Sequence, residues 1–214
     1  MGRQNIGNHV LVDNFEELLS FIKFEDSDTF YYLQYLKRRK DGNTSKSTIM
    51  LGSRFITNTT NLDKLYEEAK SICDREFARA YLSIVPRSLE KFTKECALSY
   101  VSRICNNNYT NSFKIPNEVA LYNSVAKSNE KIWLFDIDDN VDKIINYLKS
   151  KSGITILGKV ETFSGIHVFV KPFNYPDVFS DMNKTKDDKF VMDGEFSFDL
   201  KKEALTILYA CKEV

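Results

Sequence analysis

The chain has 214 residues, and its 30 basic and 30 acidic residues leave it with no net charge. A chain of this length builds one good core, and its 43% of hydrophobic residues is ordinary for a globular protein. Balanced charge excludes a general electrostatic affinity for nucleic acid, so any such binding needs a local basic patch.

The sequence carries no sign of a membrane segment or of secretion. Its apolar runs reach about five residues, against the roughly 20 that a spanning helix needs, so we expect no membrane partner. No basic start followed by an apolar stretch predicts a signal peptide. The cysteines form no C-x-x-C pair and predict free thiols in a cytoplasmic protein; they are Cys73, Cys96, Cys105 and Cys211.

The first half of the chain predicts alternating helices and strands. Apolar residues in helical rhythm predict a helix from Asp13, after which residues 29–36 predict a strand that ends in a basic turn. Next come a helix over residues 61–77, a strand that Pro86 stops, and a helix that Ser88 caps. The basic turn consists of Lys37, Arg38, Arg39 and Lys40.

The second half begins with a polar stretch at residues 106–117 that is rich in helix- and strand-breaking residues. This stretch predicts a loop or a joint between two parts of the domain. Strands and one helix follow, and the chain becomes strand-rich toward residue 210. This order predicts an α+β fold in which helices cover a mixed sheet. The expected elements are strands at 131–138, 153–160, 166–171, 195–200 and 204–210 and a helix at 140–150.

Two acids continue an apolar strand in the stretch WLFDID (133–138). Alternation places Asp136 and Asp138 on one face, about 6–7 Å apart, while Trp133, Phe135 and Ile137 form an apolar opposite face. Two carboxylates at this spacing suit a shared Mg²⁺ or Mn²⁺ ion that also binds substrate phosphates. The alternative is that the strand simply ends and its acids are solvated at the start of the next helix.

A histidine follows a polar turn in the next hairpin. Ser164 and Gly165 form the turn, and His167 then shares a strand face with Phe169 and Lys171. Imidazole and ammonium groups both donate hydrogen bonds to phosphate oxygens, so this face suits a nucleotide. A packed core histidine is the alternative.

A third acid is needed if two metal ions are to flank a phosphoryl group. In the stretch GEFSFDL (194–200), alternation puts Glu195 and Asp199 on the polar face. Asp199 is the preferred candidate, Glu195 the second, and Asp193 the third because it precedes the turn at Gly194. An amphipathic, half-exposed strand without such a role is the alternative.

Together these motifs resemble the archaeo-eukaryotic primase superfamily of primases and primase-polymerases. The motifs are FDID (135–138), SGIH (164–167) and FD (198–199), with YLSIVPRS (81–88) upstream resembling plasmid and phage members. The basic turn and Leu208-Tyr209 resemble features of small phage-borne members. The resemblance implies one domain, in which an RNA-recognition-motif-like catalytic unit (118–214) packs on an N-terminal α/β unit (1–105).

The resemblance also implies roles. Asp136, Asp138 and Asp199 would hold divalent ions, and His167 would contact the nucleotide's phosphates. The further nucleotide contacts would be Lys171, Ser164 and Arg87, and the basic turn would grip nucleic acid. The implied partners are nucleoside triphosphates, single-stranded or primed nucleic acid and a replication helicase, in a bacterial host's cytoplasm if the protein is phage-encoded.

Two other functions stay open. One is a catalytically degenerate module of the same fold that binds nucleic acid or a replication protein. The other is a haloacid-dehalogenase-like phosphatase, whose opening motif is also D-x-D, although much chain precedes the motif here and little follows it. For the enzymatic interpretation, we expect that replacing Asp136 or Asp138 abolishes nucleotide incorporation and, by relieving charge crowding, leaves the fold intact.

Overall fold

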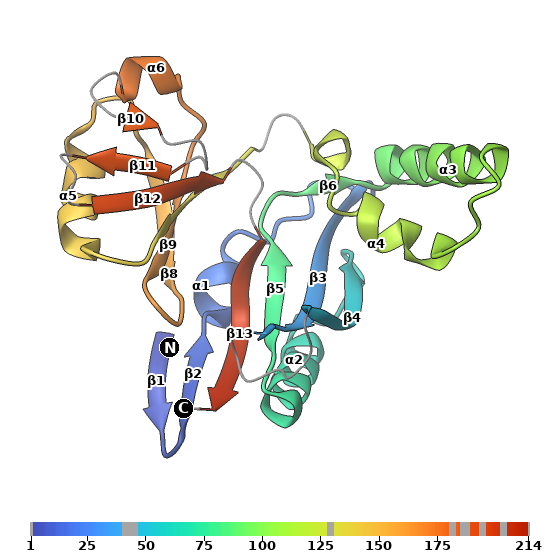
Figure 1. Ribbon diagram of the computed structural model, residues 1–214, viewed down its shortest axis with the longest axis horizontal. Coiled ribbons are helices and arrows are strands. Elements are labelled where there is room, and N and C mark those ends of the chain that lie inside the picture. Colours follow the sequence, from blue (N-terminus) through green and yellow to red (C-terminus); the bar gives the residue numbers. More distant parts are fainter. Residues whose placement is uncertain are drawn as a thin grey trace.

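The computed structural model describes residues 2–39, 47–127, 131–179, 183–184, 189–192, 196–201 and 205–213. These residues form two β-sheets with helices around them, and the sheets lie side by side in Figure 1. Asp193, Glu195 and Lys40 from the sequence predictions lie outside the described residues.

The first sheet combines the N-terminal strands with the last strand of the chain. Its strands follow the order β1-β2-β13-β5-β3-β4, and the short β6 pairs with β3. Every pairing is antiparallel. The strands are β1 (Gly2–Ile6), β2 (His9–Asp13), β3 (Thr29–Lys37), β4 (Ile49–Ile56), β5 (Arg79–Ser83), β6 (Arg87–Ser88) and β13 (Leu205–Glu213).

The second sheet uses the strands between residues 133 and 201, in the order β10-β11-β12-β7-β9-β8, again with antiparallel pairings. The two central strands that matter most below are β7 and β9, flanked by β12 and β8. The strands are β7 (Trp133–Ile137), β8 (Ile156–Glu161), β9 (Ile166–Val170), β10 (Asn183–Lys184), β11 (Lys189–Met192) and β12 (Phe196–Lys201).

Local sequence signals start and stop the longer helices. The Asn61 side chain accepts a hydrogen bond from the Lys64 amide at the start of α2, and Ser88 does the same for α3. Phe77 ends α2 in the left-handed conformation. The helices are α1 (Phe15–Leu19), α2 (Leu62–Glu76), α3 (Leu89–Cys105), α4 (Ile115–Val119), α5 (Val141–Ser150) and α6 (Tyr175–Val178), with 3₁₀ turns η2 (Ser112–Lys114) and η3 (Asn123–Val125).

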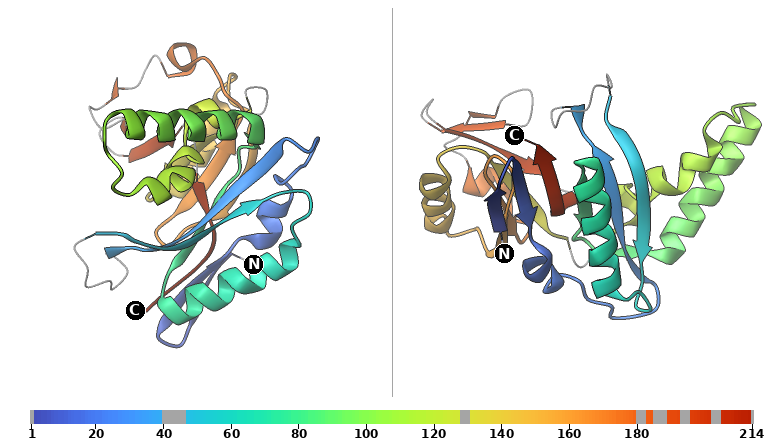
Figure 2. Two further views of the ribbon diagram at one scale, coloured as in Figure 1. Left: turned by 90° about the vertical axis from the view of Figure 1, so that its right-hand side faces the viewer. Right: turned by 90° about the horizontal axis from the view of Figure 1, so that it is seen from below.

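The helices cover different faces of the two sheets. In Figures 1 and 2, α2 lies along the first sheet, α5 lies on the outer side of the second, and α3 projects away from the body. One face of the second sheet packs its apolar side chains, such as Phe135 and Ile137, against Ile144 and Leu148 of α5. On the other face, Leu134 and Phe169 join the core of the first sheet. The two sheets therefore share one hydrophobic core.

The α+β class predicted from the sequence is confirmed, and so is the apolar face of β7 that packs on a helix. The predicted mixed sheet is wrong for the described strands, because they form two sheets with antiparallel pairings alone. The last strand, β13, lies in the first sheet between β2 and β5, although the strands that precede it in the chain form the second sheet. In the part of the chain that is described, no helix is long and apolar enough to cross a membrane.

Candidate functional site

Three residues predicted as site residues form one row across the second sheet. Asp136 of β7 lies opposite Asp199 of β12 on one side and opposite His167 of β9 on the other. Directly opposed residues in an antiparallel sheet point to the same face, with Cβ atoms about 4.5–5.5 Å apart. This row faces away from α5, because Phe135 and Ile137, the neighbours of Asp136, point toward that helix.

Asp136 is held by two partners, one on each carboxylate oxygen. Its Oδ1 atom lies 3.3 Å from Nε2 of His167, and its Oδ2 atom accepts a hydrogen bond from the ammonium group of Lys201. Its side chain is 20% exposed. Burial alone would raise the pKa of Asp136, but the hydrogen bonds and charges of His167 and Lys201 outweigh burial and hold this pKa well below its usual range. Asp136 is therefore an anion in the folded protein.

His167 is fixed from both sides of its ring. Its Nδ1 atom lies 2.9 Å from the hydroxyl oxygen of Thr206, at the start of β13, and its Nε2 atom faces Asp136. The residue is 6% exposed. Both ring nitrogens thus have protein partners, so a phosphate that binds His167 has to replace Asp136 at Nε2. The histidine also joins the two sheets, because Thr206 belongs to the first.

The hairpin between β8 and β9 packs closely on the end of β7. The Ser164 hydroxyl donates a hydrogen bond to Asp138, which is exposed. At Gly165, a Cβ atom would lie 1.9 Å from the carbonyl oxygen of Ile137. Only glycine lets the two backbones come this close. The glycine of the S-G-x-H pattern is therefore required here by packing.

A buried asparagine holds this hairpin on the first sheet. The Asn14 side chain exchanges two hydrogen bonds with the backbone of Glu161, at 2.9 and 3.3 Å, and donates a third to the carbonyl of Ile207 at 2.8 Å. Asn14 is 1% exposed, so each of these bonds satisfies a polar group that water does not reach. Asn14 therefore links β8 to β13.

Cationic side chains gather beside the tip of the same hairpin. Arg38 and Arg79 both donate to the hydroxyl of Tyr81, at 3.2 and 3.4 Å. Arg79 and Lys212 lie over the ring of Phe163, at 4.5 and 5.2 Å from its centre. Arg38 of the predicted basic turn thus contacts Tyr81, which packs in the same apolar cluster as Phe163 of the hairpin. Lys37 instead faces Glu76, with 3.9 Å between the charged groups, and Arg39 is exposed.

Two predicted nucleotide contacts lie elsewhere. Arg87 is 3% exposed and donates to the carbonyl of Tyr122 at 3.2 Å, among the elements around α3 and α4. Lys171 follows the far end of β9, four residues from His167, which corresponds to about 13 Å along a strand. Neither residue belongs to the row of Asp199, Asp136 and His167.

Sequence reasoning missed Lys201, Thr206 and Asn14. Lys201 could have been predicted from the sequence, because it stands two residues after Asp199 and therefore points to the same face of the strand. Thr206 and Asn14 had none, because their partners, His167 and Glu161, are distant in the chain and meet them only through sheet docking.

The donor chemistry of the row fits a hard divalent cation in part. Asp136 and Asp199 offer carboxylate oxygens on adjacent strands, the ligand type that Mg²⁺ and Mn²⁺ prefer. In this structure the Lys201 ammonium neutralises Asp136, and Asp138 is bonded to Ser164. Among the described residues, no group of three or more His, Cys, Asp or Glu side chains is arranged to hold a metal ion.

Comparison with known proteins returned no match: no family model, no curated protein and no solved structure is similar to this chain at the threshold applied.

Proposed function

We propose that the chain is a metal-dependent nucleotidyltransferase of the primase-polymerase type, which adds nucleotides on a nucleic-acid template. The observation that carries the proposal is the row of Asp199, Asp136 and His167 on one face of the second sheet, next to its junction with the first. Two acids and an imidazole brought together from three strands are what phosphoryl transfer requires of a protein: charge stabilisation and positioning.

The connectivity of the second sheet supports the RNA-recognition-motif-like part of the proposal. Its central elements follow the chain order β7-α5-β8-β9-α6-β12, while the strands lie in the spatial order β12-β7-β9-β8. This is a β-α-β-β-α-β arrangement with one antiparallel sheet. Residues of α5 and α6 pack on the same face, and on the opposite face Leu134 and Phe169 pack against the first sheet, which leaves the end of that face near Asp136 for a ligand.

Each residue of the site has a defined task in this proposal. Asp136 and Asp199 hold the divalent ion, which supplies neutralisation of the triphosphate when it is bound. For that, the half-exposed Lys201 has to move away from Asp136. His167, oriented by Thr206, donates from Nε2 to a phosphate oxygen. The partly exposed cations Arg38 and Lys212 attract the nucleic-acid backbone to the hairpin tip, while the buried Arg79 supports Tyr81 and Phe163.

The degenerate module remains the second candidate, because one specific contact favours it. Lys201 supplies Asp136 with the positive charge that a metal ion would otherwise provide. If that ion pair is permanent, the row is a structural element and the protein binds nucleic acid without chemistry. A haloacid-dehalogenase-like phosphatase fits poorly, because the strands on both sides of β7 are antiparallel to it, whereas a doubly wound fold needs parallel neighbours.

A nucleotide-incorporation assay tests the proposal directly. With a primed single-stranded template, nucleoside triphosphates and Mg²⁺ or Mn²⁺, we expect Asp136→Asn to lower incorporation by about 100-fold or more, since removal of one preorganised electrostatic group costs that much. Asp142→Asn is the matched control, because Asp142 is an exposed aspartate of α5, on the other side of the sheet, and should keep full activity. Parental activity in Asp136→Asn would refute the proposal.

Lys201→Gln separates the two candidates. If the row is a metal site, removing the competing ammonium tightens metal-dependent triphosphate binding severalfold. If the module is degenerate, neither the parental protein nor Lys201→Gln binds triphosphate in a metal-dependent way, and the incorporation assay gives no product with either.

A further inference from the structure

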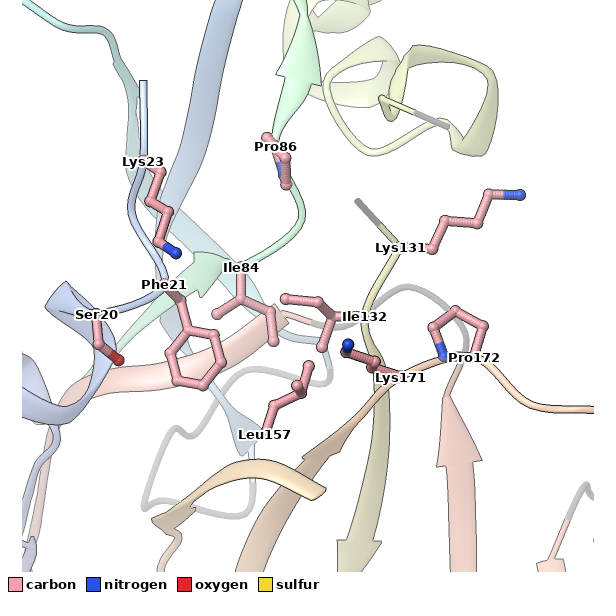
Figure 3. A pocket seen from close by; sticks show the side chains of 10 residues that line it. All are labelled: Ser20, Phe21, Lys23, Ile84, Pro86, Lys131, Ile132, Leu157, Lys171 and Pro172. Atoms are coloured by element: carbon pink, nitrogen blue, oxygen red, sulfur yellow. The ribbon is translucent and has the colours of Figure 1, made fainter. Parts of the chain in front are cut away.

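A pocket of about 640 Å³ lies between the two sheets, away from the row of Asp136. Its walls come from the segment after α1, the segment between β5 and β6, and the ends of β7, β8 and β9 that approach the first sheet (Figure 3). Pockets of this size typically enclose small organic ligands.

The charged groups of the pocket are all positive. Lys23, Lys131 and Lys171 contribute to its lining, and no acidic residue does. In Figure 3 the ammonium groups of Lys23 and Lys171 turn toward the pocket from two sides, while the side chain of Lys131 points away from its centre. Within the described part of the chain, none of the three ammonium groups has an ion-pair partner. Converging, unneutralised ammonium groups favour an anion.

The backbone beneath the two inward lysines is held in place. The Tyr31 hydroxyl accepts a hydrogen bond from the Lys23 amide at 2.9 Å and lies 3.0 Å from the Lys23 carbonyl. On the opposite wall, the Lys171 amide donates to the carbonyl of Thr155 at 3.0 Å. The two walls are therefore preorganised, and ligand binding needs to order only the lysine side chains.

The rest of the lining is apolar. Phe21, Ile84, Ile132 and Leu157 form the surface between the lysines, and Phe21 is itself braced by Phe169 in an edge-to-face contact with 5.0 Å between ring centres. If the pocket bound only an inorganic anion, this apolar surface would remain exposed to water. A ligand with both a phosphate group and a flat, largely apolar body would cover it.

We propose that this pocket binds a nucleoside phosphate, with the phosphate between Lys23 and Lys171 and the base on the apolar surface. The site is distinct from the carboxylate row, because Lys131 and Lys171 stand at the opposite ends of β7 and β9 from Asp136 and His167. It also needs no divalent ion, since the lysines themselves neutralise the phosphate. This inference does not depend on the proposed nucleotidyl transfer.

Calorimetric titration with a nucleoside 5′-monophosphate in the presence of excess EDTA tests the proposal. We expect the parental protein to bind, and Lys23→Gln/Lys171→Gln to lose affinity by about tenfold or more, because two charge-assisted contacts disappear. Lys64→Gln/Lys149→Gln changes net charge equally at exposed positions of α2 and α5 and should bind as the parental protein does. Asp136→Asn should also bind normally, which separates this site from the row.

Two further ligands and one further variant test which chemical class of ligand the pocket binds. Inorganic phosphate should bind at least about tenfold more weakly than the nucleotide, and Leu157→Asp, which puts a carboxylate on the 37% exposed edge of the apolar surface, should abolish nucleotide binding. A short single-stranded oligonucleotide that competes with the monophosphate would identify the phosphate's source as a nucleic-acid strand. No binding in EDTA, equal binding by the double lysine variant, or equal affinity for inorganic phosphate would overturn the proposal.

Discussion

The cores of the two sheets use different aromatic residues, and the difference shows where polar chemistry is tolerated. Among the largest fully buried side chains, the strands of the first sheet contribute Tyr31, Tyr32, Tyr35 and Tyr209 beside one phenylalanine, Phe30, whereas the strands of the second sheet contribute Phe135 and Phe169. Tyrosine hydroxyls need partners when they are buried, and phenylalanine rings do not.

The tyrosines of the first sheet find those partners in the surrounding helices. The Tyr209 hydroxyl donates to Asp74 of α2 at 2.9 Å, and the Tyr32 hydroxyl donates to Asn117 of α4 at 3.2 Å. Burial, followed by the hydrogen bond and charge of Asp74, raises the pKa of Tyr209, so the hydroxyl stays protonated and remains a donor. In this sheet, polar groups fasten helices to strands.

In the second sheet, the charged groups instead collect on one face, and at least one of their partners is exposed to solvent. Asp136 is held by Lys201, whose side chain is 46% exposed, so solvent and dissolved cations reach this ion pair. The first sheet therefore uses buried polarity to fix structure, and the second keeps polarity where a ligand can compete for it. Four substitutions test this contrast, in order of decreasing expected effect.

Gly165→Ala should have the largest effect, because the new Cβ atom would meet the Ile137 carbonyl at 1.9 Å and force β7 and β9 apart. We expect a loss of about 3 kcal/mol in the free energy of unfolding, measured by urea denaturation. Gly52→Ala in β4 is the control, since its Cβ would meet Tyr35 at an ordinary 3.5 Å. Equal stability of the two variants would mean that the hairpin does not pack as described.

Asn14→Ala should rank second. It removes two hydrogen bonds to Glu161 of the second sheet and one to Ile207 of the first, and it leaves backbone groups of both residues unsatisfied, which costs about 2 kcal/mol. Amide hydrogen exchange should show faster exchange in β8 than in β3, because the docking of the second sheet is what weakens. The exposed Asn106→Ala, whose amide donates only to Ser102, should stay within about 0.5 kcal/mol of the parental protein. Uniformly faster exchange would contradict a docking role.

Asp136→Asn should have a pH-dependent effect on stability. The folded-state pKa of Asp136 is lowered, so its carboxylate stabilises the protein above the unfolded-state pKa of about 3.9, and this contribution is lost as the pH falls further. We expect the variant to be less stable by about 1–2 kcal/mol at pH 7 and the difference to shrink below about pH 4. The sequence alone predicts that this substitution relieves crowding between carboxylates. The structure predicts a loss of stability instead, because Lys201 and His167 are partners of the Asp136 carboxylate. Urea unfolding of both proteins between about pH 3 and pH 7 measures this difference in stability. A difference that does not change with pH would contradict the ion pairs of Asp136.

Arg39→Gln should have the smallest effect. Arg39 is exposed at the end of β3, so stability should change by less than about 0.5 kcal/mol. Nucleic-acid affinity should fall by about threefold. The slope of log affinity against log salt concentration should decrease by about one, as expected when one phosphate contact is lost. Arg38→Gln should cost more affinity, because Arg38 reaches Tyr81 beside the hairpin. Unchanged affinity in both variants would remove the basic turn from the nucleic-acid interface.

Local patterns predicted much of the fold. The alternation in WLFDID placed Phe135 and Asp136 on opposite faces, and the Ser88 cap marked the start of α3, as the structure has them. The strands β1, β2 and β4 were not predicted. β1 and β4 are exposed over much of their length, so apolar and polar residues do not alternate clearly along them. The alternation signal depends on one buried face.

The candidate site was predicted in its acids and histidine but not in its supporting contacts. Asp136, His167 and Asp199 each lay in a recognisable short motif, and the sheet register brings them into one row. Arg87 was expected there because it lies in YLSIVPRS (81–88), one of the segments that carry the resemblance, but its side chain donates to the carbonyl of Tyr122. Which surfaces of two sheets face each other depends on long-range packing, and a single sequence does not encode that in any local pattern.

The place of β13 in the first sheet has a consequence for how the protein forms during synthesis. β2 and β5 are made early, yet the strand that lies between them is Leu205–Glu213. Until the ribosome releases those residues, two hydrogen-bonding edges stay open and the second sheet has no Thr206 against which to set His167. Such distant pairing slows folding, so the nascent chain should depend on protection of these edges, and its candidate site is assembled last.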